Sequence, residues 1–118
     1  MPTINITYVK ETNNFYVEPP LAKLTQSDQT ITWNLNGGGV WRWNDDNGNV
    51  PIVFGPAGAG YSEWTGPVPQ KVDADTYFVD LGQPNNGPAP VYFSWMFQVT
   101  DGAHVRSEDP DIGNEPHP

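Results

Sequence analysis

Apolar and polar residues alternate with a period of two along several short stretches of this chain, and the period of a helix does not recur. Residues 91–100 alternate most regularly. Because successive side chains of a strand point to opposite faces, this stretch predicts a strand with one wholly apolar face in the core. That face holds Val91, Phe93, Trp95, Phe97 and Val99, and the other holds Tyr92, Ser94, Met96, Gln98 and Thr100.

Shorter stretches show the same alternation, with turn residues between them. Residues 44–49 have the composition of a β-hairpin turn, and the Gly-rich residues 55–60 predict a loop. About seven to nine strands at a spacing near ten residues predict an all-β chain, an antiparallel β-sandwich of Greek-key type. The remaining expected strands contain Ile4, Ile6 and Tyr8; residues 15–17; Ile31, Trp33 and Leu35; residues 40–43; residues 50–54; residues 61–64; and Tyr77, Val79 and Leu81.

The length of 118 residues predicts one domain. We expect the β-sandwich in residues 1–107 and an acidic, Pro-rich C-terminal tail in residues 108–118, with a short strand at 111–113. The start of the chain lacks the basic and apolar regions of a signal peptide, and no apolar run is long enough to cross a membrane. We therefore expect a cytoplasmic protein without membrane insertion.

Charge and cysteine content narrow the possible partners and cofactors. The 14 acidic and 5 basic residues give a net charge of -9, which repels phosphate backbones and argues against nucleic acid as a partner. A basic protein, a neutral ligand or a cation stays open. The chain has no Cys, which excludes disulfides, thiol catalysis and blue-copper sites.

Three short motifs stand out in the chain: Val17-Glu18-Pro19-Pro20 followed by Gln29-Thr30-Ile31-Thr32-Trp33, then Tyr92-Phe93-Ser94-Trp95, and Asp109-Pro110-Asp111-Ile112. They resemble motifs of small cupredoxin-like domains, β-sandwiches that in many members bind copper. The ending with Asp109 to Ile112 also resembles the bacterial members without metal and, loosely, the AidA/PixA inclusion-body family. The resemblance implies a sandwich fold but no copper and no cofactor, because Ser94 stands near the place of the Cys ligand.

Catalytic chemistry has little support in the sequence. Only His104 and His117 offer imidazole bases, and no Ser stands in a nucleophile-elbow motif. We predict a solvated loop position for His104 and no catalytic or metal-ligating residue. A hydrolase that uses paired carboxylates in turns is the weakest function considered. The candidate pairs are Asp45 with Asp46, Asp73 with Asp75, and Asp109 with Asp111.

The five tryptophans provide the best functional indication. Trp33 and Trp95 lie on apolar strand faces and are expected in the core. The candidate ligand-binding residues lie near the Gly-rich loops, and they are Trp41, Arg42, Trp43, Tyr61 and Trp64. Exposed aromatic rings stack on sugars and form hot spots of protein interfaces, but a second hydrophobic cluster is the favoured interpretation of these rings.

Together these observations predict a non-enzymatic binding or structural module. Its expected partner is another protein or a second copy of itself, joined through an edge strand. A carbohydrate-binding module that uses surface tryptophans on a glycan is the alternative.

Overall fold

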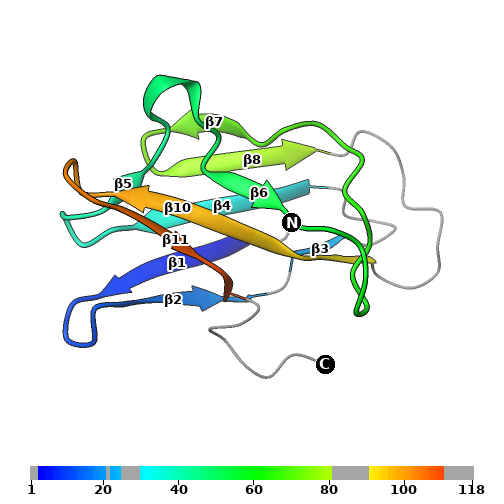
Figure 1. The fold of residues 1–118 in the computed structure, drawn as a ribbon, viewed down its shortest axis with the longest axis horizontal. Coiled ribbons are helices and arrows are strands. Elements are labelled where there is room, and N and C mark those ends of the chain that lie inside the picture. Colours follow the sequence, from blue (N-terminus) through cyan, green and yellow to red (C-terminus); the bar gives the residue numbers. More distant parts are fainter. Residues whose placement is uncertain (1–2, 21, 25–29, 81–90, 111–118) are drawn as a thin grey trace.

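The computed structural model describes residues 3–20, 22–24, 30–80 and 91–110, and it shows an all-β sandwich (Figure 1). The predicted fold class is confirmed, with eleven mostly short strands in the described residues. The strands are β1 (Thr3–Val9), β2 (Asn14–Glu18), β3 (Ala22–Leu24), β4 (Thr30–Asn36), β5 (Arg42–Trp43), β6 (Ile52–Phe54), β7 (Gln70–Asp73), β8 (Thr76–Asp80), β9 (Val91–Phe93), β10 (Trp95–Thr100) and β11 (Val105–Glu108).

The larger sheet has five strands in the order β2-β1-β4-β8-β7. Its pairs are antiparallel except β1 and β4, which run parallel with Ile4 opposite Trp33 and Ile6 opposite Leu35. The sheet is therefore mixed rather than purely antiparallel. The reason is that β2 takes one side of β1 through a hairpin, and the chain then passes through β3 before it returns as β4 in the direction of β1.

The second sheet is built around β10, with β11 on one side and both β5 and β6 on the other. β5 and β6 lie end to end, because Trp43 pairs with Val99 whereas Phe54 pairs with Trp95. They do not pair with each other, so the predicted hairpin across residues 44–49 is wrong. The polar segment instead forms a loop between β5 and β6, which pair with successive parts of β10. The loop contains the short 3-10 turn η1 (Asp46–Gly48).

Gln98 fixes both ends of this looped-out segment. Its carbonyl oxygen accepts from the Asn44 amide at 3.1 Å, and its own amide donates to the Pro51 carbonyl oxygen at 2.8 Å. Its side-chain oxygen also accepts from the side-chain amides of Asn44 and Asn49, at 3.2 and 3.1 Å. Polar residues that resemble a hairpin turn thus form a bulge because the apolar residues on both sides stay on β10.

The expected long strand of residues 91–100 is divided at Ser94, although its alternation is as predicted. β9 pairs with β3, and β10 pairs within the second sheet. The Gly55 amide donates to the Ser94 carbonyl oxygen at 2.8 Å, and a Cβ at Gly55 would stand 2.6 Å from the Ser94 hydroxyl. Because Gly55 has no side chain, its backbone can lie close to Ser94. Ser94 is the point at which the chain passes from β9 to β10.

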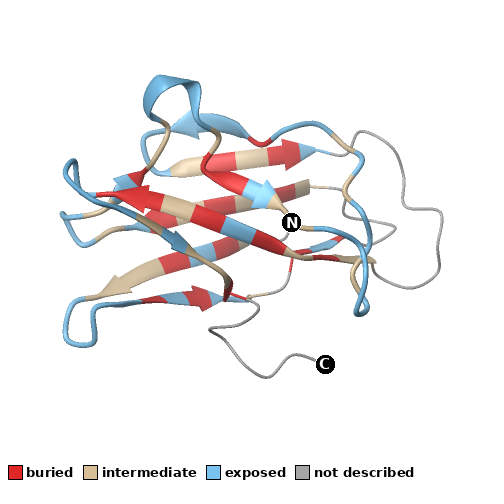
Figure 2. Cartoon of the chain, in the orientation of Figure 1, coloured by how far each residue is buried: buried red, intermediate tan, exposed pale blue. Residues whose placement is uncertain are grey.

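The core lies between the two sheets, and in strands such as β2, β3 and β4 buried positions alternate with more exposed ones (Figure 2). Trp33 and Trp95 are at most 1% exposed with ring centres 5.9 Å apart, which confirms both as core residues. Burial of one large apolar side chain contributes about 1.5–3 kcal/mol. The buried apolar side chains include Ile4, Ile6, Phe15, Val17, Leu24, Ile31, Trp33, Leu35, Trp43, Ile52, Tyr77, Val79, Phe93, Trp95, Phe97 and Val99.

Two edge strands were not expected from the sequence. All four residues of β7 are exposed, and β11 has no buried residue, so neither shows an apolar face. Residues 61–64 form no strand, and only an isolated bridge joins Tyr61 to Gly58. The predicted boundary after residue 107 falls just before the last residue of β11, and Leu81 and residues 111–118 lie outside the described residues.

Candidate functional site

The five residues singled out for ligand binding do not lie in one place. Trp43 is only 1% exposed, and its ring packs against Tyr77 and Phe97 with ring centres 5.3 and 6.3 Å apart. Arg42 lies on the opposite, exposed face of β5 and forms an ion pair of 3.1 Å with Asp46. Trp43 is therefore part of the core, and it does not belong to a surface row of tryptophans.

Trp41 lies in an aromatic cluster near one end of β2. Its ring centre is 6.1 Å from that of Tyr8 and 5.9 Å from that of Phe15. The Arg106 guanidinium lies 4.9 Å from the Phe15 ring centre and 5.4 Å from the Trp41 ring centre, within the range of cation–π attraction. Arg106 also donates to the Asn13 carbonyl oxygen at 3.0 Å. These contacts correspond to a second hydrophobic cluster at Trp41.

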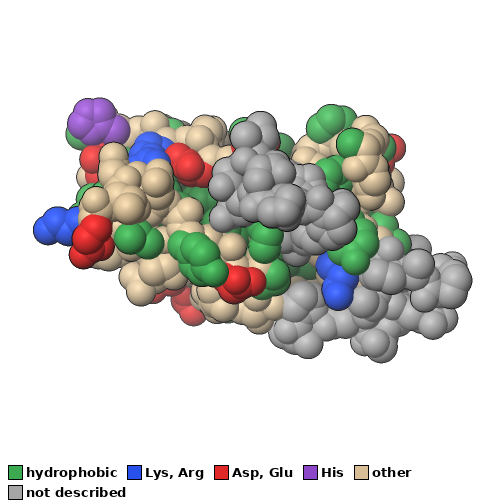
Figure 3. Space-filling model, turned by 90° about the horizontal axis from the view of Figure 1, so that it is seen from below, with side chains coloured by type: hydrophobic (Ala, Val, Ile, Leu, Met, Phe, Trp, Pro, Cys, Tyr) green, Lys and Arg blue, Asp and Glu red, His purple; other side chains and the backbone are tan. Residues whose placement is uncertain are grey.

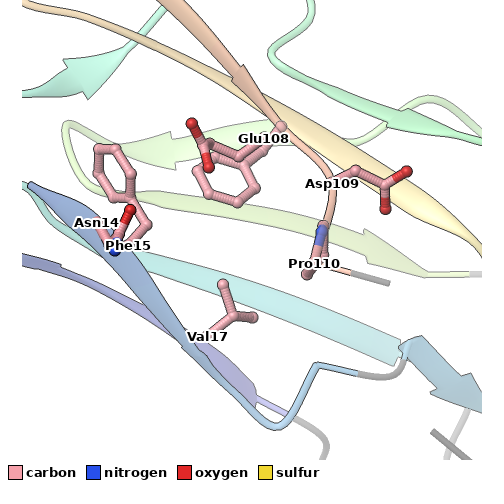
Figure 4. Close-up of a pocket in the computed structure, with 7 residues that line it drawn as sticks. Asn14, Phe15, Val17, Glu108, Asp109 and Pro110 are labelled. Atoms are coloured by element: carbon pink, nitrogen blue, oxygen red, sulfur yellow. The ribbon is translucent and has the colours of Figure 1, made fainter. Parts of the chain in front are cut away.

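Beside this cluster, a small groove of about 190 Å³ opens between β2 and β11 (Figure 4). The Glu108 carboxylate points along the groove, and the Asp109 carboxylate points the opposite way. Glu108 accepts from Arg106 at 3.0 Å, so its charge is already matched by a basic side chain. The groove is lined by Asn14, Phe15, Val17, Phe97, Glu108, Asp109 and Pro110.

Figure 3 shows the molecule from below the view of Figure 1. On its described surface, Lys and Arg side chains are scattered, some of them beside Asp and Glu side chains, and they do not gather into a separate patch. This described face therefore presents mixed charges rather than a continuous field of one sign.

The turn carboxylates are held in structural contacts. Asp45 accepts from Lys71 Nζ at 2.8 Å and from the Tyr77 hydroxyl at 3.1 Å. The Lys71 hydrogen bond in particular lowers the pKa of Asp45, and the backbone amide of Asp75 lowers the pKa of Asp73. A general acid needs a raised pKa, so both shifts are opposite to those that acid catalysis requires.

His104 is 77% exposed in the turn between β10 and β11, as expected for a solvated loop histidine. Its backbone amide and that of Ala103 donate to one Asp101 oxygen at 2.7 and 2.8 Å. The Ala103 and His104 amides lower the pKa of Asp101 to about 2. Asp101 and His104 thus shape a turn, whereas His117 lies outside the described residues.

A larger and more apolar groove, of about 380 Å³, lies between β6 and residues 64–69. The Trp64 ring stacks on Phe54 with ring centres 4.3 Å apart and planes 11° apart. The indole N–H of Trp64 donates to the Pro67 carbonyl oxygen at 2.9 Å, which holds the 64–69 segment in its curved path. The groove is lined by Val50, Ile52, Val53, Phe54, Trp64, Gly66, Pro67, Val68 and Pro69.

The walls of this β6 groove offer almost no hydrogen bonds from side chains. Among the described residues that line the groove, only Trp64 has a polar side-chain atom, and the Pro67 carbonyl oxygen already accepts from it. Val53 and Val68 are 50% and 59% exposed, and Met96, directly opposite Val53 on β10, is 39% exposed. Adjacent exposed apolar side chains of this kind are typical of surfaces that bind other apolar groups.

Of the predicted ligand-binding residues, Trp64 alone lines the β6 groove. Tyr61 belongs to the preceding loop, where its backbone bonds to Gly58. Sequence reasoning missed Val53 and Val68. The signal that was present is the apolar run of residues 50–54, because an alternating strand with one solvated face would show polar residues within it.

Comparisons with known proteins add no family. No family model matches the chain, and no curated protein and no solved structure matches it. In the described part of the chain, no helix is both long and apolar enough to cross a membrane. The resemblance to cupredoxin-like domains and the cytoplasmic location therefore stay predictions.

Proposed function

We propose that this protein is a non-enzymatic binding module that takes an apolar segment of a partner protein into the β6 groove. The observation that carries this proposal is the pair of half-exposed valines, Val53 and Val68, on the two walls of an open groove with the stacked Phe54 and Trp64 rings. Transfer of apolar side chains from water into such a groove releases about 25 cal/mol for each Å² that is buried.

The chemistry of the walls favours a protein over a glycan. A sugar presents hydroxyl groups around its ring, and a glycan site needs side chains that bond to them as well as a stacking ring. The β6 groove offers the Trp64 ring, but its indole N–H is already bonded to Pro67. A carbohydrate-binding module at Trp64 is the second candidate, and self-assembly through the same groove is the third.

The proposed fold family follows the sequence resemblance and is a cupredoxin-like domain without copper. It is supported by the β-sandwich architecture and by Ser94 in place of a Cys ligand. The proposed location is the cytoplasm. Neither proposal is needed for the binding site, which depends only on β6 and residues 64–69.

A selection from peptides displayed on phage tests the proposed function, with a glycan array and light scattering beside it. The selection uses the wild-type protein, and enriched peptides are measured by fluorescence anisotropy on the wild type, Val53→Asp and Val105→Asp. Val105 is 56% exposed on β11, away from the groove, so Val105→Asp is the matched control. Val68→Asp repeats the test on the opposite wall.

We expect apolar peptides to bind the wild type and Val105→Asp, and to bind Val53→Asp and Val68→Asp about tenfold or more weakly. A glycan that quenches tryptophan fluorescence, with no peptide enriched, would overturn the proposal in favour of the carbohydrate-binding module. A stable dimer that Val53→Asp dissociates would point to self-assembly instead.

A further inference from the structure

The loop between β5 and β6 carries an Asn-Gly pair, Asn47-Gly48, in its exposed part. Residues 46–49 are all exposed, and the loop projects beyond the strands (Figure 1). Asn47 has a left-handed backbone with φ 57° and ψ 33°, and Gly48 follows with φ +80°. Nothing lies within 4 Å of the position that a Cβ of Gly48 would occupy. The pair is therefore open to solvent and is not packed against the sheets.

An exposed Asn-Gly pair has a reaction of its own, because asparagine is a thermolabile residue. The backbone nitrogen of the glycine attacks Cγ of the asparagine, so that a nitrogen–carbon bond forms and the Cγ–Nδ2 bond breaks. The glycine N–H proton and the departing amide group leave together as ammonia. Water then opens the cyclic imide at one of its two carbonyl groups, which gives aspartate or isoaspartate. Glycine favours the attack because it has no side chain to hinder it.

Asn47 contributes none of the bonds that hold this loop. The loop is fixed by the side-chain oxygen of Gln98, which accepts from the side-chain amides of Asn44 and Asn49 at 3.2 and 3.1 Å. Within the described ranges, the Asn47 side chain has no hydrogen-bond partner. Asn47 and the peptide that follows it can therefore rotate into the geometry of attack while the two sheets stay folded.

The other Asn-Gly pair of the described residues, Asn36-Gly37, is restrained by the fold. The side-chain oxygen of Asn36, the last residue of β4, accepts from the Gly38 amide at 3.2 Å. The Gly37 carbonyl oxygen accepts from the Val40 and Trp41 amides at 3.1 and 3.0 Å. The Trp41 carbonyl oxygen also fills the space beside the Gly37 Cα. Rotation of the peptide between Asn36 and Gly37 would break these contacts.

We infer that Asn47 is a site of spontaneous modification, at which the folded protein converts asparagine into aspartate and isoaspartate, and that the fold protects Asn36 from the same reaction. Water is the co-reactant, and ammonia is released. The reaction adds a carboxylate next to Asp46, and isoaspartate also lengthens the backbone of the loop by a methylene group. The inference does not involve the β6 groove and is independent of the proposed function.

Peptide mapping tests the inference, because cleavage by trypsin after Arg42 places Asn36 and Asn47 in different peptides. The third pair, Asn86-Gly87, lies outside the described residues and falls in a separate peptide. The wild type is incubated in mildly alkaline buffer, once folded and once unfolded in concentrated urea. Mass spectrometry follows the conversion of amide into acid at each asparagine, and chromatography separates the aspartate and isoaspartate peptides. Asn47→Gln and the matched control Asn36→Gln are mapped in parallel.

In the folded protein, we expect Asn47 to lose its amide about tenfold or more faster than Asn36, which corresponds to a difference of about 1.4 kcal/mol or more in activation free energy. In urea the two rates should converge, because no fold then restrains either pair. Asn47→Gln should remove isoaspartate from the peptide that contains residue 47. Asn36→Gln should leave the rate at Asn47 unchanged.

Equal rates at Asn36 and Asn47 in the folded protein would overturn the protection of Asn36. An Asn47 that stays intact in the folded protein, over a period in which the chain in urea loses this amide, would overturn the modification site. If Asn36 stayed tenfold slower in urea as well, the difference would come from the local sequence, and the role assigned to the fold would be overturned.

Discussion

The indole N–H of Trp43 donates a 2.8 Å hydrogen bond to the carbonyl oxygen of Asp75. This bond joins β5, at the edge of the second sheet, to the turn between β7 and β8 of the larger sheet. The same carbonyl oxygen accepts from the Leu35 amide at 2.9 Å. Trp43 thus fastens one sheet to the other, and its role is in stability rather than in binding.

Substitution of Trp43 should therefore affect stability, whereas substitution of Trp64 should affect peptide binding. Trp43→Phe loses the bond to Asp75 and leaves a cavity in the core, and we expect it to lower the free energy of unfolding by about 2–4 kcal/mol. Trp64→Ala removes a wall of the β6 groove and should abolish peptide binding. Urea unfolding and fluorescence anisotropy measure the two effects. A variant of Trp43 that folds stably but no longer binds would contradict this division.

Tyr77 should make stability depend on pH in alkaline solution. Burial, aided by the hydrogen bond to Asp45, raises the pKa of Tyr77 to about 12. A folded pKa above the unfolded value of about 10 stabilises the fold fully below pH about 10, and the benefit is lost as the pH rises toward 12. We expect the free energy of unfolding, measured with urea, to fall by about 2 kcal/mol between pH about 10 and about 12. In Tyr77→Phe this fall in the free energy of unfolding with pH should be absent. The same fall in the variant and the wild type would show that Tyr77 does not cause it.

Asp101 should maintain the turn between β10 and β11. Its pKa of about 2 lies below the ordinary value, so its contribution to stability is present above pH about 4 and is lost as the pH falls through about 2. Asp101→Ala removes the acceptor of the Ala103 and His104 amides. We expect faster hydrogen exchange in β11, with exchange in β1 unchanged. Equal protection of β11 in the variant and the wild type would refute the role.

Gly37 should tolerate no side chain. A Cβ there would stand 1.8 Å from the Trp41 carbonyl oxygen, within a turn that two backbone bonds to the Gly37 carbonyl oxygen close. We expect Gly37→Ala to lower the free energy of unfolding by about 2–4 kcal/mol. Gly39→Ala is the control in the same turn, with open space around it but a φ of +78°, and should cost only about 1 kcal/mol. Similar losses in the two variants would contradict the steric argument.

The strands of the core could be predicted from the sequence because their apolar residues alternate. Trp33 illustrates this, since it has polar neighbours, Thr32 and Asn34, on both sides in the chain. β7 and β11 could not be predicted in this way, because neither has a buried residue and each is held by backbone bonds to one neighbour. The hairpin at residues 44–49 was mistaken because turn composition does not distinguish a hairpin from a bulge.

The candidate site was predictable only in part. The sequence indicated Trp64 as a candidate ligand-binding aromatic near a Gly-rich loop, but it placed Trp43 in the same class although Trp43 is buried. Nothing local in the sequence distinguishes the two. Whether Val53 and Val68 are exposed depends on which segments pack beside β6, and this is a property of the tertiary structure.

The most direct test of the binding site is a map of backbone amide chemical shifts during titration with a peptide enriched in the phage selection. Binding in the β6 groove predicts that the largest changes occur at residues 52–54 and 64–68, and that these changes are absent in Val53→Asp. Shifts that gather instead around Phe15 and Glu108, at the groove between β2 and β11, would contradict the assignment of binding to the β6 groove.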